Sequence, residues 1–333
     1  MKKTRRTVAL LLAILLLCSA FVGCSSKSRE QKVIGTCAGF DVLYEELRYV
    51  TLTYKDLFAN TYGKDIWSNP ESAESYRAEL EEIVWDMMLN NYAVLAACLE
   101  YGMTKDDMKH KDIEAAVDAQ VNEMIEQYGS KADFRADLES LYMTEHFLRF
   151  CFRVAQLENE LMYILTQDLG FIEADLDPFI DWLEDGNCYY VQHVYIENDP
   201  GEDPEENRAV AEDIRLQLLA GADIADFVGT KVNEDFENVS PYFFVRDVYT
   251  KVMEDAVFAL DNVGDVSEVV DTGDGYYVLV RLETDEAKLL LQSSDLLTSY
   301  QWAHVESVVD TFKSKIKLEL NEYGKSIDLL EIQ

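Results

Sequence analysis

The spacing of hydrophobic residues divides the chain into a helical region and a region of mixed structure. Between residues 44 and 186, apolar residues recur at steps of three and four, a pattern typical of amphipathic helices. Asn69-Pro70 is a favourable helix start, and the apolar stripe that follows predicts one long helix ending at Gly102. Further helices are predicted over residues 44–60, 104–128, 144–167 and 172–184.

The pattern changes at Cys188. Tyr189–Ile196 is rich in β-branched and aromatic residues over the length of a strand. The order predicted from there is β-α-α-β-α-β-β, followed by a return to helix. Its helices are predicted over 207–220, 223–231, 249–260 and 293–317, and its later strands over 266–270, 276–282 and 316–320. A short pair of extended segments is also predicted over 32–42, ahead of the first helix.

The first residues have the form of an export signal. Four basic residues precede an apolar run from Val8 to Leu17, which is too short to span a bilayer. Val22-Gly23 before Cys24 resembles the lipobox of bacterial lipoproteins, which implies removal of residues 1–23 and a diacyl lipid on Cys24. The alternative is an ordinary signal peptide with a chance cysteine. Residues 24–32 are polar and are predicted to form a flexible tether.

Charge and cysteine content exclude several classes of function. The net charge of −35 falls to −39 when the signal and its four basic residues are removed, and such a surface repels nucleic acid and anionic headgroups. No second apolar run approaches spanning length, so we expect membrane contact through the lipid alone.

Four cysteines remain, which allow three disulfide pairings, although their apolar surroundings favour free buried thiols. Scattered histidines and the lack of C-x-x-C spacing predict no metal site. The remaining cysteines are Cys37, Cys98, Cys151 and Cys188.

Residues 188–284 resemble the parvulin family of peptidyl-prolyl isomerases. The most specific match is Glu254–Ser267, which resembles the family's proline-pocket helix and the glycine turn after it. Weaker matches lie in the opening strand at Gln192–Ile196, in Phe244-Val245-Arg246, and in the closing strand at Thr272, Gly275 and Tyr276. The resemblance implies prolyl isomerase activity, a reaction that makes no bond and requires no nucleophile, metal or cofactor.

The remainder of the chain resembles the foldase lipoproteins of the PrsA type and the SurA-like chaperones. The matching segments are Val33–Leu47 and the stretch from Tyr101 to Thr144. The resemblance implies an α+β fold, in which a mostly helical chaperone domain is built from the N- and C-terminal segments and a parvulin-like α/β domain is inserted between them. The expected division is a signal at 1–23, a tether at 24–32, a helical chaperone region at 33–187, the isomerase domain at 188–284, and a C-terminal helix and strand at 285–333.

Carried over position by position, the family's active site is only partly kept. His193 matches the first catalytic histidine, and Tyr277 stands where the family has a second one. The family's Asp or Cys falls within Val232–Asp235, where Asn233 and Asp235 both fit and Asp235 is taken as the candidate. No glycine is present in the stretch before Phe244 where the family has several. The substrate-binding candidates are Phe244, Tyr249, Met253, Phe258 and Thr272.

Two functions from different classes remain open. The first is a foldase on the extracytoplasmic face of the cell membrane, lipid-anchored, that isomerises prolyl bonds in unfolded or nascent secreted polypeptides. The second is a non-catalytic secretion chaperone that keeps a degenerate parvulin domain as a binding surface; in that case His193 is a hydrogen-bonded core histidine. A solute-binding lipoprotein lacks support because no repeated βαβ lobes are visible. The sequence names no client, and a homodimer stays open.

Overall fold

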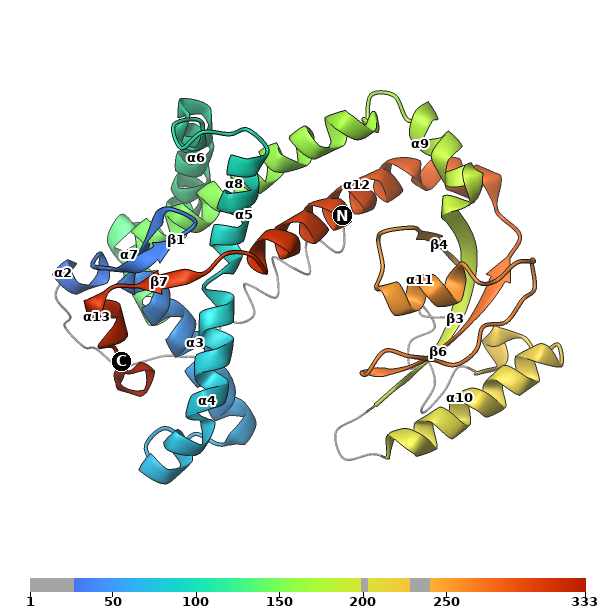
Figure 1. Ribbon diagram of the computed structural model, residues 1–333, viewed down its shortest axis with the longest axis horizontal. Coiled ribbons are helices and arrows are strands. Elements are labelled where there is room, and N and C mark those ends of the chain that lie inside the picture. The colour runs from blue at the N-terminus through green and yellow to red at the C-terminus, as the bar shows by residue number, and fades with distance from the viewer. Residues whose placement is uncertain (1–26, 199–202, 228–239) are drawn as a thin grey trace. The chain divides into compact units, whose positions relative to one another are not determined.

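The computed structural model describes residues 27–198, 203–227 and 240–333 (Figure 1). The proposed lipidation site Cys24 and the candidate Asp235 lie outside the described residues. The chain divides into two compact units. Unit 1 comprises the chain up to Leu161 together with Ser307–Gln333, and unit 2 comprises Met162–Glu306.

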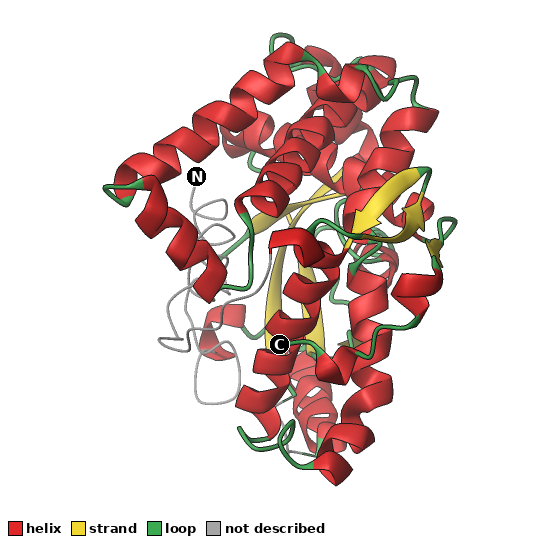
Figure 2. Cartoon of the chain, turned by 90° about the vertical axis from the view of Figure 1, so that its left-hand side faces the viewer, coloured by secondary structure: helices red, strands yellow, loops and turns green. Residues whose placement is uncertain are grey.

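Unit 1 is mostly helical, and helices dominate the described chain as a whole (Figure 2). Each predicted helical stretch of this region contains helix, and the apolar stripes form its core. The elements that begin in this unit are α2 (Lys27–Glu30), β1 (Val33–Cys37), β2 (Phe40–Leu43), α3 (Tyr44–Tyr62), α4 (Pro70–Met87), α5 (Asn90–Glu100), α6 (Lys111–Gln127), α7 (Lys131–Ser140), α8 (Glu145–Leu169), β7 (Leu318–Leu320) and α13 (Glu322–Lys325).

The two ends of the chain meet in the small sheet of unit 1. Its strand order is β2-β1-β7, and β7 runs antiparallel to β1, with Gly35 opposite Leu320. A Cβ on Gly35 would lie 2.5 Å from the Glu319 carbonyl oxygen, so this close approach of two backbones requires glycine. The buried Lys55 ammonium then donates to the carbonyls of Leu330 (2.7 Å) and Ile332 (3.0 Å). This pairing places the N-terminal segment and the last strand in one compact unit.

Several predicted boundaries in unit 1 were wrong. The predicted long helix is interrupted at Met88 and Leu89, which separate α4 from α5. Both residues keep near-helical backbone angles, and neither a Gly nor a Pro stands at the interruption. The Thr104–Asp107 capping pair forms, but it closes a short 3-10 turn, and α6 begins only after His110. Helix α7 was not predicted. Part of the predicted tether is ordered, because α2 occupies Lys27–Glu30.

Unit 2 is built around an antiparallel sheet of order β4-β3-β6-β5. The order of its elements from β3 to β6 is the predicted one, except that the described part of the second helix, predicted over 223–231, is a 3-10 turn at Ile224–Phe227. Strand β5 and helix α11 are shorter than predicted, and the predicted helix at 172–184 is reduced to α9 because its first residues form a turn. The elements are α9 (Asp177–Trp182), β3 (Cys188–Glu197), α10 (Pro204–Leu219), β4 (Tyr242–Val245), α11 (Lys251–Val257), β5 (Val270–Asp271), β6 (Gly275–Leu282) and α12 (Glu286–Lys313).

Alternation along β3 sends its side chains into different cores. Val194 and Ile196 pack with α10. Tyr190, on the same face of the strand, packs with Phe179 of α9 and with Leu297 of α12. Val191, on the opposite face, packs with Met253 of α11. Helices α9 and α12 thus contribute to the core of unit 2 although both lie outside the predicted domain at 188–284, whose boundaries stay a prediction.

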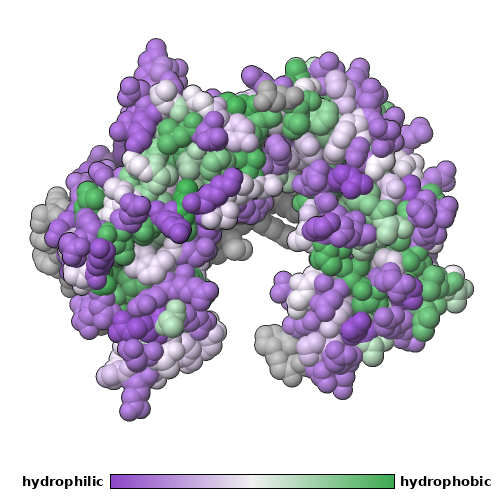
Figure 3. Space-filling view, in the orientation of Figure 1, coloured by the Kyte–Doolittle hydropathy of each residue, from purple (hydrophilic) through white to green (hydrophobic). Residues whose placement is uncertain are grey.

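The four cysteines of the described chain are free thiols. Burial raises the pKa of Cys37 to about 11 and that of Cys98, Cys151 and Cys188 to about 12. Hydrophilic side chains cover most of the visible surface, with hydrophobic patches between them (Figure 3).

Candidate functional site

The candidate residues gather on the α11 side of the unit 2 sheet. His193 is on the central strand β3, and its neighbours on the two flanking strands are tyrosines. Tyr242 of β4 lies opposite Val191, and Tyr277 of β6 lies opposite Tyr195. His193 is therefore diagonal to both Tyr242 and Tyr277, a spacing that aromatic side chains can bridge.

The two tyrosines contact His193 in different ways. The Nδ1 atom of His193 lies 3.1 Å from the Tyr242 hydroxyl, within hydrogen-bond distance. Tyr277 instead packs its ring against the imidazole, with 5.2 Å between ring centroids and 64° between planes. Within the described residues no hydrogen bond joins Tyr277 to His193, so the phenol does not take over the bond expected of a second histidine.

Burial decides the charge of this group. It lowers the pKa of His193 to about 4, so the imidazole is neutral at pH 7. Burial also raises the pKa of the Tyr242 hydroxyl well above its ordinary value, with smaller contributions from Tyr249 and Tyr277. The pair is therefore a neutral imidazole and a neutral phenol over the whole physiological range.

An apolar and aromatic surface continues from this pair toward α11. Phe244 is fully buried and Met253 is 8 % exposed. The Tyr249 ring stacks on Phe244 with centroids 4.0 Å apart and planes within 18°, while Tyr249 itself is 41 % exposed. Phe258 meets Phe244 edge-on at 5.9 Å. Six of the eight candidates in the parvulin-like region thus share one cluster, but Tyr249 covers the ring that was expected to contact proline.

The other two candidates are not placed there. Thr272 is in the β5–β6 turn, where its hydroxyl donates to the Gly275 carbonyl (3.0 Å), a bond that holds the turn. Asp235 lies outside the described residues. Both assignments stay predictions.

Tyr242 is the residue of this site that the sequence alone did not single out. It stands in the stretch before Phe244 that lacks the family's glycines, which was the available signal. Its link to His193 depends on the register between β3 and β4, and a single sequence does not provide that register.

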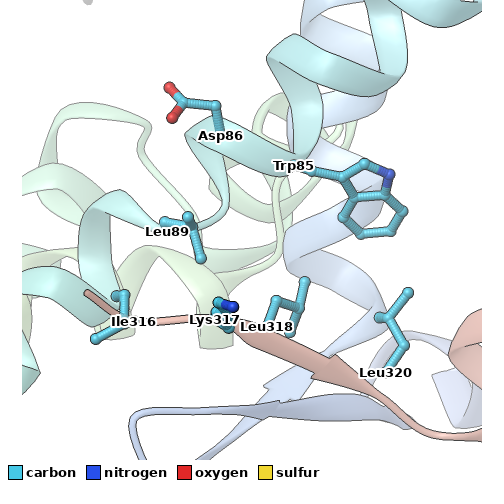
Figure 4. A pocket seen from close by; sticks show the side chains of 7 residues that line it. All are labelled: Trp85, Asp86, Leu89, Ile316, Lys317, Leu318 and Leu320. Atoms are coloured by element: carbon cyan, nitrogen blue, oxygen red, sulfur yellow. The ribbon is translucent and has the colours of Figure 1, made fainter. Parts of the chain in front are cut away.

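A hollow lies in unit 1, beside the edge strand β7 (Figure 4). It has a volume of about 430 Å³ and is lined mainly by apolar side chains. At its rim Asp86 pairs with Lys313 at 2.7 Å. The lining residues are Trp85, Asp86, Leu89, Ile316, Lys317, Leu318 and Leu320.

Residues 27–198, 203–227 and 240–333 contain no group of three His, Cys, Asp or Glu side chains arranged to hold a metal ion. None of their helices combines the length and the hydrophobicity needed to cross a membrane.

Comparison with known proteins bears on this arrangement. No family model matches the chain. The foldase protein PrsA of Caldanaerobacter subterraneus subsp. tengcongensis is 22 % identical over 285 residues, which cover 83 % of this chain and 82 % of that protein. The chain is similar to the PrsA foldases. This similarity confirms the resemblance drawn from the sequence.

Two solved PrsA structures were also found. PrsA from Bacillus anthracis, described as a peptidylprolyl isomerase, is 14 % identical, with 69 % of this chain and 96 % of that chain covered and a TM-score of 0.39. The foldase protein PrsA from Streptococcus pneumoniae is 15 % identical, with 79 % and 91 % covered and a TM-score of 0.32. The similarity of this chain to PrsA is carried by its sequence match to the Caldanaerobacter protein.

Proposed function

We propose that this PrsA-like chain is a lipid-anchored foldase on the extracytoplasmic face of the membrane. Unit 2 isomerises prolyl bonds of unfolded secreted polypeptides, and unit 1 acts as a chaperone for the same clients. The similarity to PrsA supports the foldase role, and the signal with Cys24 supports the location. The reaction is assigned from the geometry around His193.

The observation that carries the reaction is a neutral, desolvated imidazole bonded to a phenol on an aromatic surface. Rotation about a peptide bond has a barrier of about 18–20 kcal/mol, because the amide loses its conjugation at the twisted transition state. The twisted amide has less charge separation than the planar one, so a surface without charge and with little water favours it. Stabilising the twisted form more than the planar form is what accelerates the reaction.

The chain's own residues divide this work. His193 and Tyr242 provide neutral hydrogen-bonding groups at the centre of the sheet. Tyr249 and Tyr277, both partly exposed, present aromatic rings on which a proline ring can pack. Phe244 and Met253 lie beneath them and are almost inaccessible, so they support the surface rather than contact the substrate.

A peptide assay on residues 25–333 tests this proposal. The fragment should accelerate cis–trans isomerisation of a Pro-containing peptide, more slowly than a parvulin with two histidines does. His193→Ala should lower that rate at least about tenfold. The matched control is His304→Ala, which removes a half-buried histidine on α12 in the same unit and should leave the rate unchanged. Equal losses in both variants, or none in either, would contradict the site.

One observation favours the alternative of a non-catalytic chaperone. Tyr249 lies flat on Phe244 and leaves no direct access to it, so the proline pocket of the family is occupied by the chain itself. Under this alternative the fragment shows no turnover but still suppresses aggregation of a Pro-free client. A prolyl isomerase assay and an aggregation assay on the same preparation separate the two functions.

A further inference from the structure

We propose that Tyr242 is the positioning residue of His193. Its hydroxyl donates to Nδ1, which holds the imidazole in the tautomer with its proton on Nε2 and directs that N–H to the substrate. The role in turnover rests on the proposed isomerase function, whereas the tautomer can be tested without it.

The contact is fixed by the sheet rather than by a flexible side chain. Strands β3 and β4 pair in a register that sets Tyr242 opposite Val191, two residues from His193. The two rings are 5.4 Å apart and nearly perpendicular, at 80°, with the hydroxyl 3.1 Å from Nδ1. Tyr242 also packs against the α11-side core.

The direction of the hydrogen bond follows from the donor and acceptor strengths of the two groups. Within the described residues, the side chains of His193 and Tyr242 make no hydrogen bond other than this one. If the hydroxyl donates, the phenol proton and the Nδ1 lone pair are both satisfied, and only the Nε2 proton is left for a ligand. If Nδ1 donates instead, the phenol proton has no acceptor and Nε2 has no donor. Each arrangement leaves one donor without a partner in the chain, but a phenol O–H is a stronger donor than a neutral imidazole N–H, and an imidazole nitrogen is a stronger acceptor than a phenol oxygen. The first arrangement is therefore preferred.

This arrangement gives the site one defined hydrogen-bond donor. The Nε2 proton can bond to the carbonyl oxygen of the residue before proline, on the side of the ring away from Tyr242. A phenol suits this task because burial keeps both groups neutral. Neither group changes its proton count near pH 7, so the tautomer stays the same across that range.

Nitrogen NMR of the intact chain tests the proposal directly. With ¹⁵N-labelled protein at pH 7, His193, assigned by loss of its signals in His193→Ala, should show a pyridine-type Nδ1 and a protonated Nε2. Tyr242→Phe keeps the ring and removes only the hydroxyl, and its His193 signals should move toward the average of mixed tautomers. The matched control is Tyr277→Phe, which should leave the His193 nitrogen shifts nearly unchanged because Tyr277 contacts His193 through its ring.

Turnover gives the second measurement. Tyr242→Phe should lower kcat about five- to tenfold with little change in KM, since one neutral hydrogen bond is lost and the packing is kept. A protonated Nδ1 in the wild type, or unchanged His193 shifts in Tyr242→Phe, overturns the proposal. A tautomer that depends on Tyr242 in a chain without isomerase activity would refute the catalytic proposal alone and leave the positioning role standing.

Discussion

Glu46 allows a quantitative test of the core of unit 1. Its side chain is 5 % exposed in the first turn of α3. The carboxylate accepts from the Leu43 amide (2.8 Å) and from the Tyr92 hydroxyl (2.8 and 2.9 Å). Burial, with a smaller contribution from Glu45, outweighs these bonds and raises the pKa of Glu46 from 4.5 to about 7.

The sign and size of the effect follow from linkage. A carboxyl whose pKa is raised in the folded state binds its proton more tightly there, so its contribution to stability is complete at low pH and is lost as pH rises toward 7. The shift corresponds to roughly 3 kcal/mol, at about 1.4 kcal/mol per unit. Glu46→Gln keeps the shape and can keep both hydrogen bonds, but it has no charge to desolvate. It should therefore stabilise unit 1 by less than about 1 kcal/mol at pH 5 and by roughly 3 kcal/mol at pH 9.

Urea unfolding followed by circular dichroism at both pH values measures this difference. The control is Glu82→Gln, an exposed carboxyl on α4 whose replacement should change stability by no more than about 0.5 kcal/mol at either pH. If Glu46→Gln destabilises the protein equally at pH 5 and pH 9, Glu46 is an ionised, well-paired carboxylate and the argument from burial fails.

Three further predictions concern the site, the anchor and the domain boundaries. Tyr277→His should raise isomerase turnover, by up to about 100-fold, because a smaller ring relieves crowding against His193 and restores the second imidazole; a fall in the peptide assay would show that the Tyr277 ring supports the site. Cys24→Ser should move the protein from the membrane fraction to the soluble fraction, since a diacyl group is needed for stable anchoring; a mutant that still sediments after a high-salt wash would contradict the lipoprotein assignment. Residues 162–306 should give a better dispersed NMR spectrum than residues 188–284, because only the longer fragment keeps the packing of α9 and α12 on β3 and β4; equal dispersion would support the shorter boundaries.

The sequence predicted helices and strands better than it predicted where they end. The apolar stripe through α4 and α5 is continuous, so it gives no sign that the chain leaves the helix at Met88 and Leu89. The four residues of β4 were implied by the order of elements but could not be bounded, because so short an apolar run has no periodicity of its own. The joining of the N- and C-terminal segments was anticipated from the family resemblance, but the pairing of β7 with β1 was not predicted.

For the site, the sequence could select residues but not their partners. His193, Tyr277, Tyr249 and Met253 were chosen by position, and the structure brings them to one face of the sheet. The hydrogen bond from Tyr242 is a contact between strands separated by nearly 50 residues of chain. Such a contact depends on register and on ring orientation, which a single sequence leaves undetermined.

The pairing of β1 with β7 also has a consequence for the order of folding during synthesis. The Asn321 side chain donates to the Val33 carbonyl across 288 residues of chain, so unit 1 cannot close until the segment that contains β7 has been made. Unit 2 is continuous and can fold earlier. A product that stops short of β7 lacks the carbonyls that satisfy buried Lys55 and leaves the edge of β1 open. An open strand edge and an unsatisfied buried ammonium favour aggregation and proteolysis, so the sheet disfavours chains that lack β7.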